Sequence, residues 1–366
     1  MKIPSLLDLD TEQRAVLDLP FHGRHVVTGV PGAGKTVMAV YRAWALSVAG
    51  RDVTLFTYSN LLHQYLAQLA PDLTEALNVT TYHRWFREFW KKRFGTDPPL
   101  SGEDAFGYDW IGIQRECVRK RVTSNAHLVI DEGQNLPVAF YQLCRILGVG
   151  VTVFADENQR IDDADSSLSE IRRSLGVPTV PLVLRENRRC SREIAILASE
   201  FRNASRDPMC LPTRVGAIPT VLKIPSVESF LVQVSHCFKA HPERSIGIIC
   251  RSTRLLRDVQ SRLTRLGLAK YTQAYAHDDP YRDAIDFSTR PIRIVTAASM
   301  KGLEFDSLFV PDLEAYADDP TSVEARLRLF VLCTRARDYL HFAYRGPDEP
   351  AILSDISESV LVRRNR

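Results

Sequence analysis

A glycine-rich stretch at residues 29–36 constrains the fold more than any other part of the chain. It reads Gly-Val-Pro-Gly-Ala-Gly-Lys-Thr and matches every fixed position of the G-x-x-x-x-G-K-S/T phosphate-binding pattern. A short β-branched segment at residues 25–28 precedes it, and residues 37–44 follow with apolar side chains at helical spacing. The alternative, a glycine-rich turn before an unrelated helix, leaves the complete match unexplained. The stretch therefore predicts a strand–loop–helix unit that binds phosphate.

The residue types in this loop suit a nucleoside triphosphate. Glycines let the backbone wrap the phosphates, and the N–H groups at the helix start point toward them. Lys35 is expected to reach the β- and γ-phosphates, and the Thr36 hydroxyl to ligate Mg²⁺. We therefore expect ATP and Mg²⁺ as cofactors. The predicted cofactor-binding residues of the loop are Gly29, Pro31, Gly32, Ala33, Gly34, Lys35 and Thr36.

Two adjacent carboxylates form the second chemical motif. Residues 127–130 are a short apolar segment typical of a buried strand, and Asp131 and Glu132 follow it directly. Asp131 is expected to hold Mg²⁺ through water, and Glu132 to act as the general base that polarises the attacking water. Two acids after a strand are common in proteins. Their place downstream of a phosphate loop, within one plausible domain, favours the catalytic interpretation.

Composition and charge restrict the class of protein. The chain has 366 residues, 45% of them hydrophobic and 25% charged, which is typical of about two globular domains. A net charge of +3 is too small to imply nucleic-acid binding by itself, so any such surface must be a local patch. The seven cysteines include no C-x-x-C pair, which favours reduced thiols and a cytoplasmic location. No apolar stretch approaches transmembrane length, so we expect no membrane association.

Residues 84–94 combine aromatic and basic side chains. Trp85, Phe86, Phe89 and Trp90 recur at helical spacing with arginines and lysines around them. Basic groups interleaved with aromatics suit single-stranded nucleic acid. The same spacing also predicts an amphipathic helix whose aromatic side chains belong to the core. Both interpretations hold if the basic flank of the helix faces a nucleic-acid strand.

Taken together, these motifs resemble the UvrD/Rep-like branch of the superfamily 1 helicases. Residues 29–36 match motif I of that family, residues 131–134 the D-E-x-Q form of motif II, and residues 156–159 the D-x-x-Q of motif III. Residues 296–306 fit motif V with its Lys-Gly-Leu-Glu-Phe core, and residues 331–337 fit motif VI. The looser matches are residues 57–60 to motif Ia, residues 81–85 to motif Ib and residues 184–189 to motif IV.

The resemblance implies roles for residues outside the phosphate loop. The implied catalytic residues, with Lys35 and Glu132, are Gln159 as a sensor of the γ-phosphate and Arg189 and Arg335 as arginine fingers. Taken alone, each of these arginines would be read as a surface residue. The further cofactor-binding residues are Gln13, which would read adenine, Arg188, Gly302 and Glu304, which would touch the ribose. The implied nucleic-acid contacts are Tyr58, Asn60, His83 and Trp85.

The chain departs from the family in three places. Asp162 and Ala164 stand where the family has aromatic residues that stack on bases, and such stacking contributes roughly 1–3 kcal/mol per base. Arg188 stands where the family has an adenine-stacking Tyr. The large insertion subdomains of the family are reduced to short inserts. The sequence therefore resembles a motor reduced almost to its two core domains.

Strand and helix patterns alternate through both halves of the chain. Residues 79–83 are expected as a short strand, and the basic residues 363–366 as a solvated tail. The alternation predicts an α/β protein with two RecA-like domains of the P-loop NTPase class, each a parallel sheet with helices on both faces. We place the first domain at residues 1–180, with a short insert at about 86–126, and the second at residues 181–366, with a short insert at about 252–291. ATP is expected between the domains, at the carboxyl ends of the strands.

The resemblance implies an ATP-dependent DNA helicase or translocase. Such an enzyme would hydrolyse ATP to move on single-stranded DNA in the 3′→5′ direction, in DNA repair, recombination or phage defence; RNA is the weaker alternative for the strand. A second hypothesis is a nucleotide-switched ATPase subunit that binds a protein partner, for example a nuclease, without processive unwinding. The reduced inserts and missing aromatic residues favour this second possibility.

Overall fold

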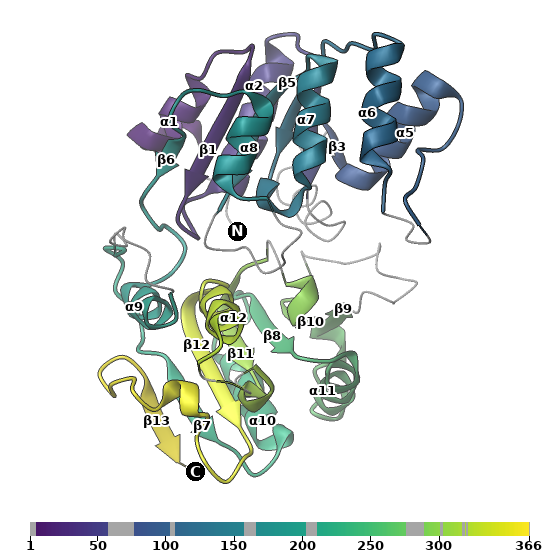
Figure 1. Ribbon diagram of the computed structural model, residues 1–366. Helices are drawn as coiled ribbons and strands as arrows, with labels where there is room; N and C mark the ends of the chain where they lie inside the picture. The colour runs from purple at the N-terminus through teal and green to yellow at the C-terminus, as the bar shows by residue number, and fades with distance from the viewer. Residues whose placement is uncertain are drawn as a thin grey trace. The chain divides into compact units, whose positions relative to one another are not determined.

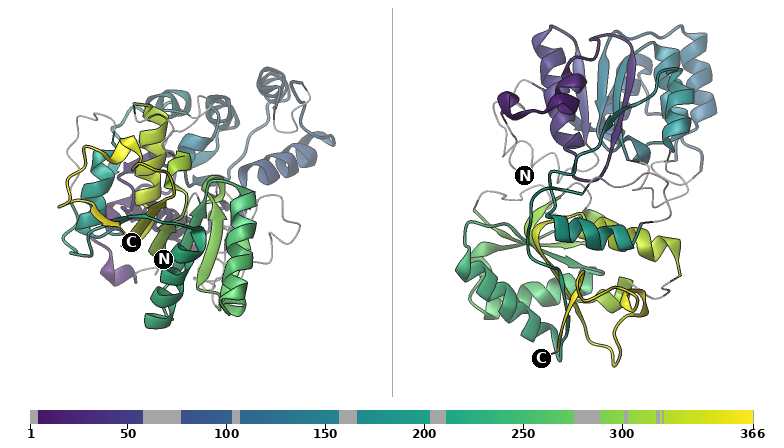
Figure 2. Two further views of the ribbon diagram at one scale, coloured as in Figure 1. Left: turned by 90° about the horizontal axis from the view of Figure 1, so that it is seen from below. Right: turned by 90° about the vertical axis from the view of Figure 1, so that its left-hand side faces the viewer.

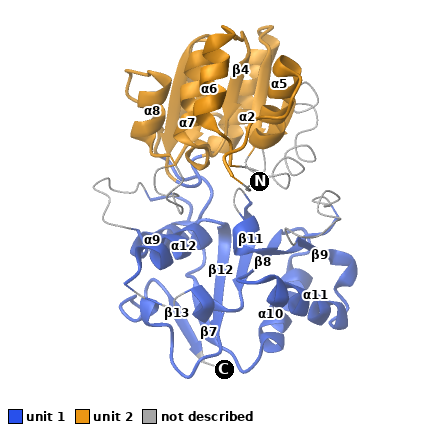
Figure 3. Cartoon of the chain, turned by 45° about the vertical axis from the view of Figure 1, so that its right-hand side comes forward, with its two compact units in different colours: residues 1, 31–33, 186–366 blue, residues 2–30, 34–185 orange. Residues whose placement is uncertain are grey.

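The structure is a computed structural model that describes residues 5–57, 77–102, 107–156, 166–202, 211–275, 289–300, 303–316, 319 and 321–365. The chain divides into two compact units (Figure 3). Unit 2 comprises residues 2–30 and 34–185. Unit 1 comprises residue 1, residues 31–33 and residues 186–366.

Unit 2 is built on a six-stranded sheet whose strands are all parallel. The strand order is β3 (Asn78–Thr81), β2 (Val53–Thr57), β4 (His127–Ile130), β5 (Gly150–Ala155), β1 (Arg24–Gly29) and β6 (Leu182–Leu184) (Figure 1). Val27 of β1 lies opposite Phe154 of β5, and Val129 of β4 lies opposite Thr152. Since β5 separates β1 from β4, the segments that follow these three strands meet at one edge of the sheet.

Helices cover both faces of this sheet, and the central strands are therefore buried on both sides. On one face lie α1 (Thr11–Leu17) and α2 (Lys35–Val48), and on the other α6 (Trp110–Arg119), α7 (Val138–Leu147) and α8 (Leu168–Leu175) (Figure 2). The aromatic helix α5 (Tyr82–Phe94) directly follows β3. Helix ends follow local capping chemistry: the Asp10 side chain accepts a hydrogen bond from the N–H of Gln13 at the start of α1.

Unit 1 is a second parallel sheet, of seven strands. The strand order is β13 (Val362–Asn365), β7 (Thr220–Lys223), β12 (Ala336–Tyr344), β11 (Phe305–Val310), β8 (Ile246–Cys250), β10 (Ile292–Thr296) and β9 (Thr272–Tyr275). One face is covered by α10 (Val227–Ala240) and α11 (Thr253–Arg265), the other by α9 (Arg192–Glu200) and α12 (Val323–Cys333) (Figure 2). Short 3-10 turns within the described residues are Leu6–Asp8, Gly133–Asn135, Ala269–Tyr271, Ala297–Ser299, Leu313–Tyr316 and Ala351–Leu353.

The predicted fold class, an α/β chain with two parallel sheets covered by helices on both faces, is confirmed, and the arrangement within the units is consistent with RecA-like domains. Residues 182–184, which we assigned to the second domain, pair with β1 and extend the sheet of unit 2. Among the described residues, no helix has both the length and the apolar character needed to cross a bilayer.

Two local predictions are wrong. The strand expected at residues 79–83 ends at Thr81, and Tyr82 and His83 belong to α5, because Tyr82 and Phe86 bury their rings on one helical face. The expected solvated tail contains the edge strand β13, which pairs with β7. Arg363 is held there by Glu349, at 2.9 Å, and by backbone carbonyls.

Candidate functional site

The glycine-rich loop joins β1 to α2, as the motif predicts. The helix begins at Lys35, directly after Gly34, whose φ of +85° lies in the left-handed region. A Cβ atom on Gly29 would lie 2.5 Å from the carbonyl oxygen of Leu184, so this position has no room for a side chain. The first N–H groups of a helix lack helical acceptors, and the start of α2 therefore offers donors to an anion.

Lys35 is buried and held by three oxygen atoms. Its ammonium group donates to the carbonyl oxygens of Gly29, at 2.7 Å, and Val30, at 3.1 Å. It also lies 3.0 Å from a carboxylate oxygen of Asp156, whose side chain is 1% exposed. Asp156 directly follows β5, the strand beside β1, so the strand order brings the two residues together.

Asp131 lies next to Thr36, as expected of two ligands for one cation. Asp131 follows β4 and is buried, and it accepts a hydrogen bond from the Thr36 hydroxyl. Burial, followed by the neighbouring Glu132, raises the pKa of Asp131 to about 7. Its Oδ2 atom has no hydrogen-bond partner among the described residues. A buried carboxylate oxygen without a partner, beside a hydroxyl, fits the hard oxygen ligands that Mg²⁺ prefers.

Glu132 occupies a strained backbone position. Its φ of +54° and ψ of +44° lie in the left-handed region, which residues other than glycine rarely adopt. The turn around it is fixed by the next residue: a Cβ atom on Gly133 would lie 2.3 Å from Val153. The Tyr141 hydroxyl also donates to the carbonyl of Gly133.

The Gln134 side chain connects Glu132 to Asp156. Its amide nitrogen lies 2.6 Å from Glu132 Oε2, and its amide oxygen accepts the N–H of Asp156 at 3.0 Å. Gln134 is 2% exposed. A continuous chain of contacts thus runs from Glu132 through Gln134 and Asp156 to Lys35. The sequence reasoning assigned no role to Gln134 or Asp156, although both belong to the motifs that it quoted.

Gln13 lies beside the glycine-rich loop. The residue is 3% exposed, and a Cβ atom on Gly34 would lie 3.1 Å from its side-chain nitrogen. Its amide oxygen accepts the N–H of Asp10 at 3.3 Å, which closes the capping box of α1. The helix cap thus holds Gln13 at the loop, and its expected role in reading adenine stays a prediction.

In unit 1, Arg189 and Glu304 form an ion pair with each other. The resemblance assigns both residues to contacts with the nucleotide. The Nε of Arg189 lies 2.7 Å from Glu304 Oε2, and its Nη1 donates to the carbonyl of Thr334 at 3.2 Å. Burial opposes ionisation of Glu304, but nearby cations, Arg189 foremost, hold its pKa at about 2. Arg335 is 1% exposed and donates to the carbonyls of Val331, at 3.3 Å, and Leu303, at 3.5 Å.

The remaining predicted residues of the loop tip and of motif IV also lie in unit 1. Pro31 and Ala33 are buried, and Gly32, with a φ of +83°, has no room for a Cβ atom because Asn187 Oδ1 would lie 2.3 Å away. Arg188 is partly exposed and pairs with Glu186. Four predicted site residues lie outside the described residues: Tyr58, Asn60, Gln159 and Gly302.

The aromatic side chains of α5 pack inside unit 2. The Trp85 ring stacks on Phe89 with centroids 5.1 Å apart and contacts Phe56 at 5.2 Å. The His83 ring nitrogen Nδ1 lies 3.5 Å from the Tyr108 hydroxyl. The basic side chains of the helix are exposed: Arg84, Arg87, Lys91, Lys92 and Arg93. The helix is therefore amphipathic, with aromatic residues in the core and basic residues on the surface.

The fold and the geometry of unit 2 define an α/β protein with a glycine-rich loop between a strand and a helix. No protein-family model matches the chain, and no curated protein sequence matches it. Among solved structures, the chain is similar to the C-terminal domain of a possible DNA helicase from Lactobacillus plantarum WCFS1. That similarity has 17% sequence identity and a TM-score of 0.37, and covers 48% of this chain and 97% of the other. A TM-score of this size assigns no function.

Proposed function

We propose that the chain is an ATP-dependent motor of the UvrD-like helicase or translocase type, which hydrolyses ATP to move 3′→5′ on single-stranded DNA. The observation that carries the proposal is the set of groups at one edge of the unit 2 sheet. Lys35 and Thr36 start α2, while Asp131 and Glu132 directly follow β4, with Thr36 hydrogen-bonded to Asp131. This is the set of groups that P-loop enzymes use for phosphoryl transfer.

Each side chain has a specific task in the proposed reaction. The N–H groups at the start of α2 and the Lys35 ammonium bind the β- and γ-phosphates. Thr36 and Asp131 hold Mg²⁺, which neutralises phosphate charge when it is bound. Glu132 accepts a proton from the attacking water, and Gln134 fixes the direction of its carboxylate. Lys35 exchanges the Asp156 carboxylate for phosphate oxygens when nucleotide binds.

The roles of unit 1 are part of the same proposal. Arg189 and Arg335 are proposed to place positive charge on the γ-phosphate, which stabilises the charge that develops in phosphoryl transfer. Gln159 is proposed to sense the same phosphate. Glu304 orders the Arg189 guanidinium through the 2.7 Å contact.

Single-stranded DNA is the proposed partner, and RNA is the weaker alternative. The exposed basic side chains of α5 support this part of the proposal, because cations bind the phosphate backbone without regard to sequence. On this view the packed rings of Trp85 and Phe89 stiffen the helix that presents the basic side chains.

The decisive experiment measures ATP hydrolysis with and without single-stranded DNA that carries a duplex block at its 3′ or its 5′ end. We expect single-stranded DNA to stimulate ATP hydrolysis strongly. A motor that moves 3′→5′ should displace the duplex block at the 5′ end, which lies ahead of it. The Glu132→Gln variant serves as the inactive control. Hydrolysis that DNA does not stimulate contradicts the motor.

A second candidate function follows from the small size of the inserts. Between β3 and β4 the described residues form α5 and α6, and between β8 and β10 they form α11, a 3-10 turn and β9. Such inserts favour a nucleotide-switched ATPase subunit that binds a protein partner, for example a nuclease. This candidate predicts nucleotide binding and slow hydrolysis at a rate that DNA leaves unchanged.

A further inference from the structure

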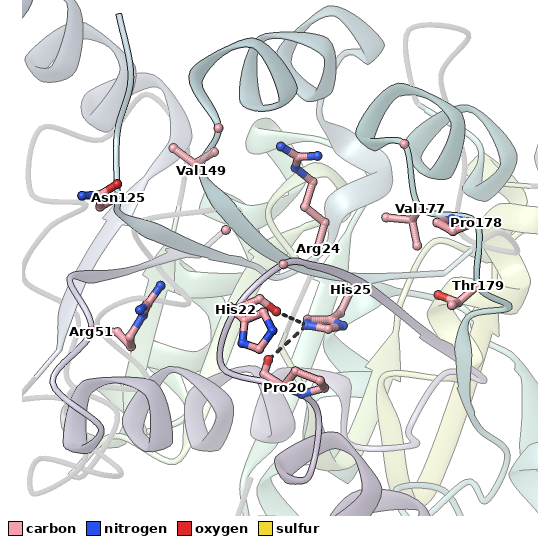
Figure 4. A pocket seen from close by; sticks show the side chains of 14 residues that line it. Pro20, His22, Arg24, His25, Arg51, Asn125, Val149, Val177, Pro178 and Thr179 are labelled. Atoms are coloured by element: carbon pink, nitrogen blue, oxygen red, sulfur yellow. Dashed lines mark hydrogen bonds between the residues drawn. The ribbon is translucent and has the colours of Figure 1, made fainter.

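A cavity of about 740 Å³ opens in unit 2 at the amino-terminal edge of the sheet (Figure 4). One wall is formed by Pro20 and His22, which lead into β1, and by Arg24 and His25, which begin the strand. Residues that precede β2, β4, β5 and β6 complete the lining. Since Arg24 begins β1 and Gly29 ends it, the strand places about 17 Å between this cavity and the glycine-rich loop.

The charged side chains that line the cavity are all cationic. Arg24 and Arg51 line it together with His22 and His25, and no aspartate or glutamate of the described part of the chain lines it. A third arginine, Arg42, is fully buried behind this wall. Its guanidinium bonds the carbonyl oxygens of Leu19, at 2.7 Å, and Pro20.

Within the described residues, no carboxylate forms an ion pair with any of the three arginines, Arg24, Arg42 and Arg51. Burial lowers the pKa of Arg42 to about 10, so it stays charged at neutral pH. The carboxyl ends of α1, α2, α6, α7 and α8 lead toward this edge, and at about −0.5 charge each they sum to about −2.5, against +3 for the three arginines.

Some carbonyl groups at these helix ends accept backbone N–H groups, and one accepts a hydrogen bond from Arg24. Leu147 accepts the N–H of Ser124, and the carbonyl of Arg172 accepts the N–H of Val177. The carbonyl of Leu175 accepts one N–H of Arg24 at 3.2 Å. The buried Nε of Arg24 has no partner among the described residues. Within the described residues the guanidinium of Arg24 donates to no acceptor other than Leu175, so its Nη2 group is left for a ligand.

His25 shapes the cavity rather than charging it. Its Nε2 lies 3.0 Å from the carbonyl oxygen of Pro20 and 2.9 Å from that of His22, so this nitrogen donates (Figure 4). Burial, and to a smaller extent the charge of Arg42, lowers the pKa of His25. The ring is therefore neutral at pH 7, and it fixes the loop that carries His22.

We propose that this cavity binds the phosphate group of a ligand larger than the bare ion. Guanidinium groups match the geometry of phosphate oxygens, and the volume lies in the range of about 300–1,000 Å³ found for small-molecule sites. The site is separate from the glycine-rich loop and does not depend on the proposed motor activity. The phosphate belongs to a free phosphorylated compound or to a nucleic-acid backbone.

The test uses pyrophosphate as the probe and isothermal titration calorimetry as the readout. The full chain carries Lys35→Ala to weaken phosphate binding at the glycine-rich loop. We expect this chain to bind one pyrophosphate, and the additional change Arg51→Gln to weaken that binding at least tenfold. Arg115→Gln, an exposed arginine on α6 outside the cavity, is the matched control and leaves the affinity unchanged.

Two results overturn the proposal: absence of binding in the Lys35→Ala chain, or an equal affinity in the Arg51→Gln and Arg115→Gln chains. Circular dichroism confirms that each variant is folded, and His22→Ala provides a second exposed variant of the wall. Competition then identifies the source of the phosphate. Displacement of pyrophosphate by a single-stranded oligonucleotide indicates a backbone phosphate, and displacement by adenosine monophosphate alone indicates a free compound.

Discussion

The ammonium group of Lys35 lies 3.0 Å from the carboxylate of Asp156, and both side chains are buried. The lysine of the glycine-rich loop thus has an internal counter-ion. Any phosphate that binds the loop must compete with this carboxylate. The pair therefore affects both the stability of the chain without nucleotide and its response to nucleotide.

Replacing Asp156 by Asn is expected to lower the free energy of unfolding by about 3 kcal/mol, because it leaves a buried ammonium without its counter-ion. ATP with Mg²⁺ is expected to restore more stability to this variant than to the wild type, since phosphate then compensates Lys35. Chemical denaturation with and without nucleotide measures both effects. Glu116→Gln, in an exposed pair of the same unit, is the control and should change little. Equal stability of Asp156→Asn and wild type would contradict the role of the pair.

Replacing Glu132 by Gln is expected to reduce kcat for ATP hydrolysis at least 100-fold while ATP binding persists. The amide keeps the size of the side chain and cannot accept a proton from water. Steady-state hydrolysis and equilibrium binding of a fluorescent ATP analogue separate the two effects. Retained hydrolysis in this variant removes Glu132 from its proposed role.

Replacing Gln134 by Glu is expected to lower kcat about 10-fold with little change in KM. A carboxylate at this position still accepts the N–H of Asp156, but it cannot donate to Glu132 and repels it. The acid limb of the pH–rate profile should therefore move upward by roughly one pH unit, since a second negative charge disfavours the ionised base. Gln142→Glu, exposed on α7, is the control. A profile that does not move would assign Gln134 a purely structural role.

Asp312 should make the chain less stable as the pH rises. Burial, together with the nearby Glu314, raises the pKa of Asp312 from 3.8 to about 7. The folded state therefore binds the Asp312 proton more tightly than the unfolded state does. The stability that this proton contributes is complete below about pH 4 and is lost as the pH rises through 7. Asp312→Asn cannot ionise and should gain stability on the order of 2 kcal/mol over wild type at pH 8. Denaturation at pH 5 and pH 8 tests this, and a variant no more stable than wild type at pH 8 would contradict it.

Reversing two charges on α5, Lys91→Glu with Lys92→Glu, is expected to weaken binding of single-stranded DNA at least tenfold at low salt. Both side chains are exposed, and a phosphate contact is lost at each position. Fluorescence anisotropy with a labelled oligonucleotide measures the affinity and its salt dependence. Arg254→Glu with Arg265→Glu, exposed on α11, makes the same change in net charge elsewhere. Equal loss in both double variants would indicate a general charge effect instead of a surface on α5.

The sequence predicts the local chemistry of the proposed nucleotide site but not the contacts between distant segments. The strand–loop–helix unit around Lys35 and the acids after β4 follow from short motifs with a fixed local geometry. The pairing of Lys35 with Asp156 depends on β5 lying beside β1, which no spacing in the sequence specifies. The helix at Tyr82 and the strand at residues 362–365 were missed for a related reason. In both, burial and pairing with a remote segment override the local pattern.

Gly29 illustrates how packing can impose the same residue that chemistry requires. The carbonyl of Leu184 fills the space in which a side chain at position 29 would stand, and it also accepts the N–H of Val30 at 3.1 Å. Glycine is needed there to seat β6 whether or not the chain binds a nucleotide. In a comparison of related chains, retention of this glycine would thus report the architecture, and retention of Lys35 together with Glu132 would report catalysis.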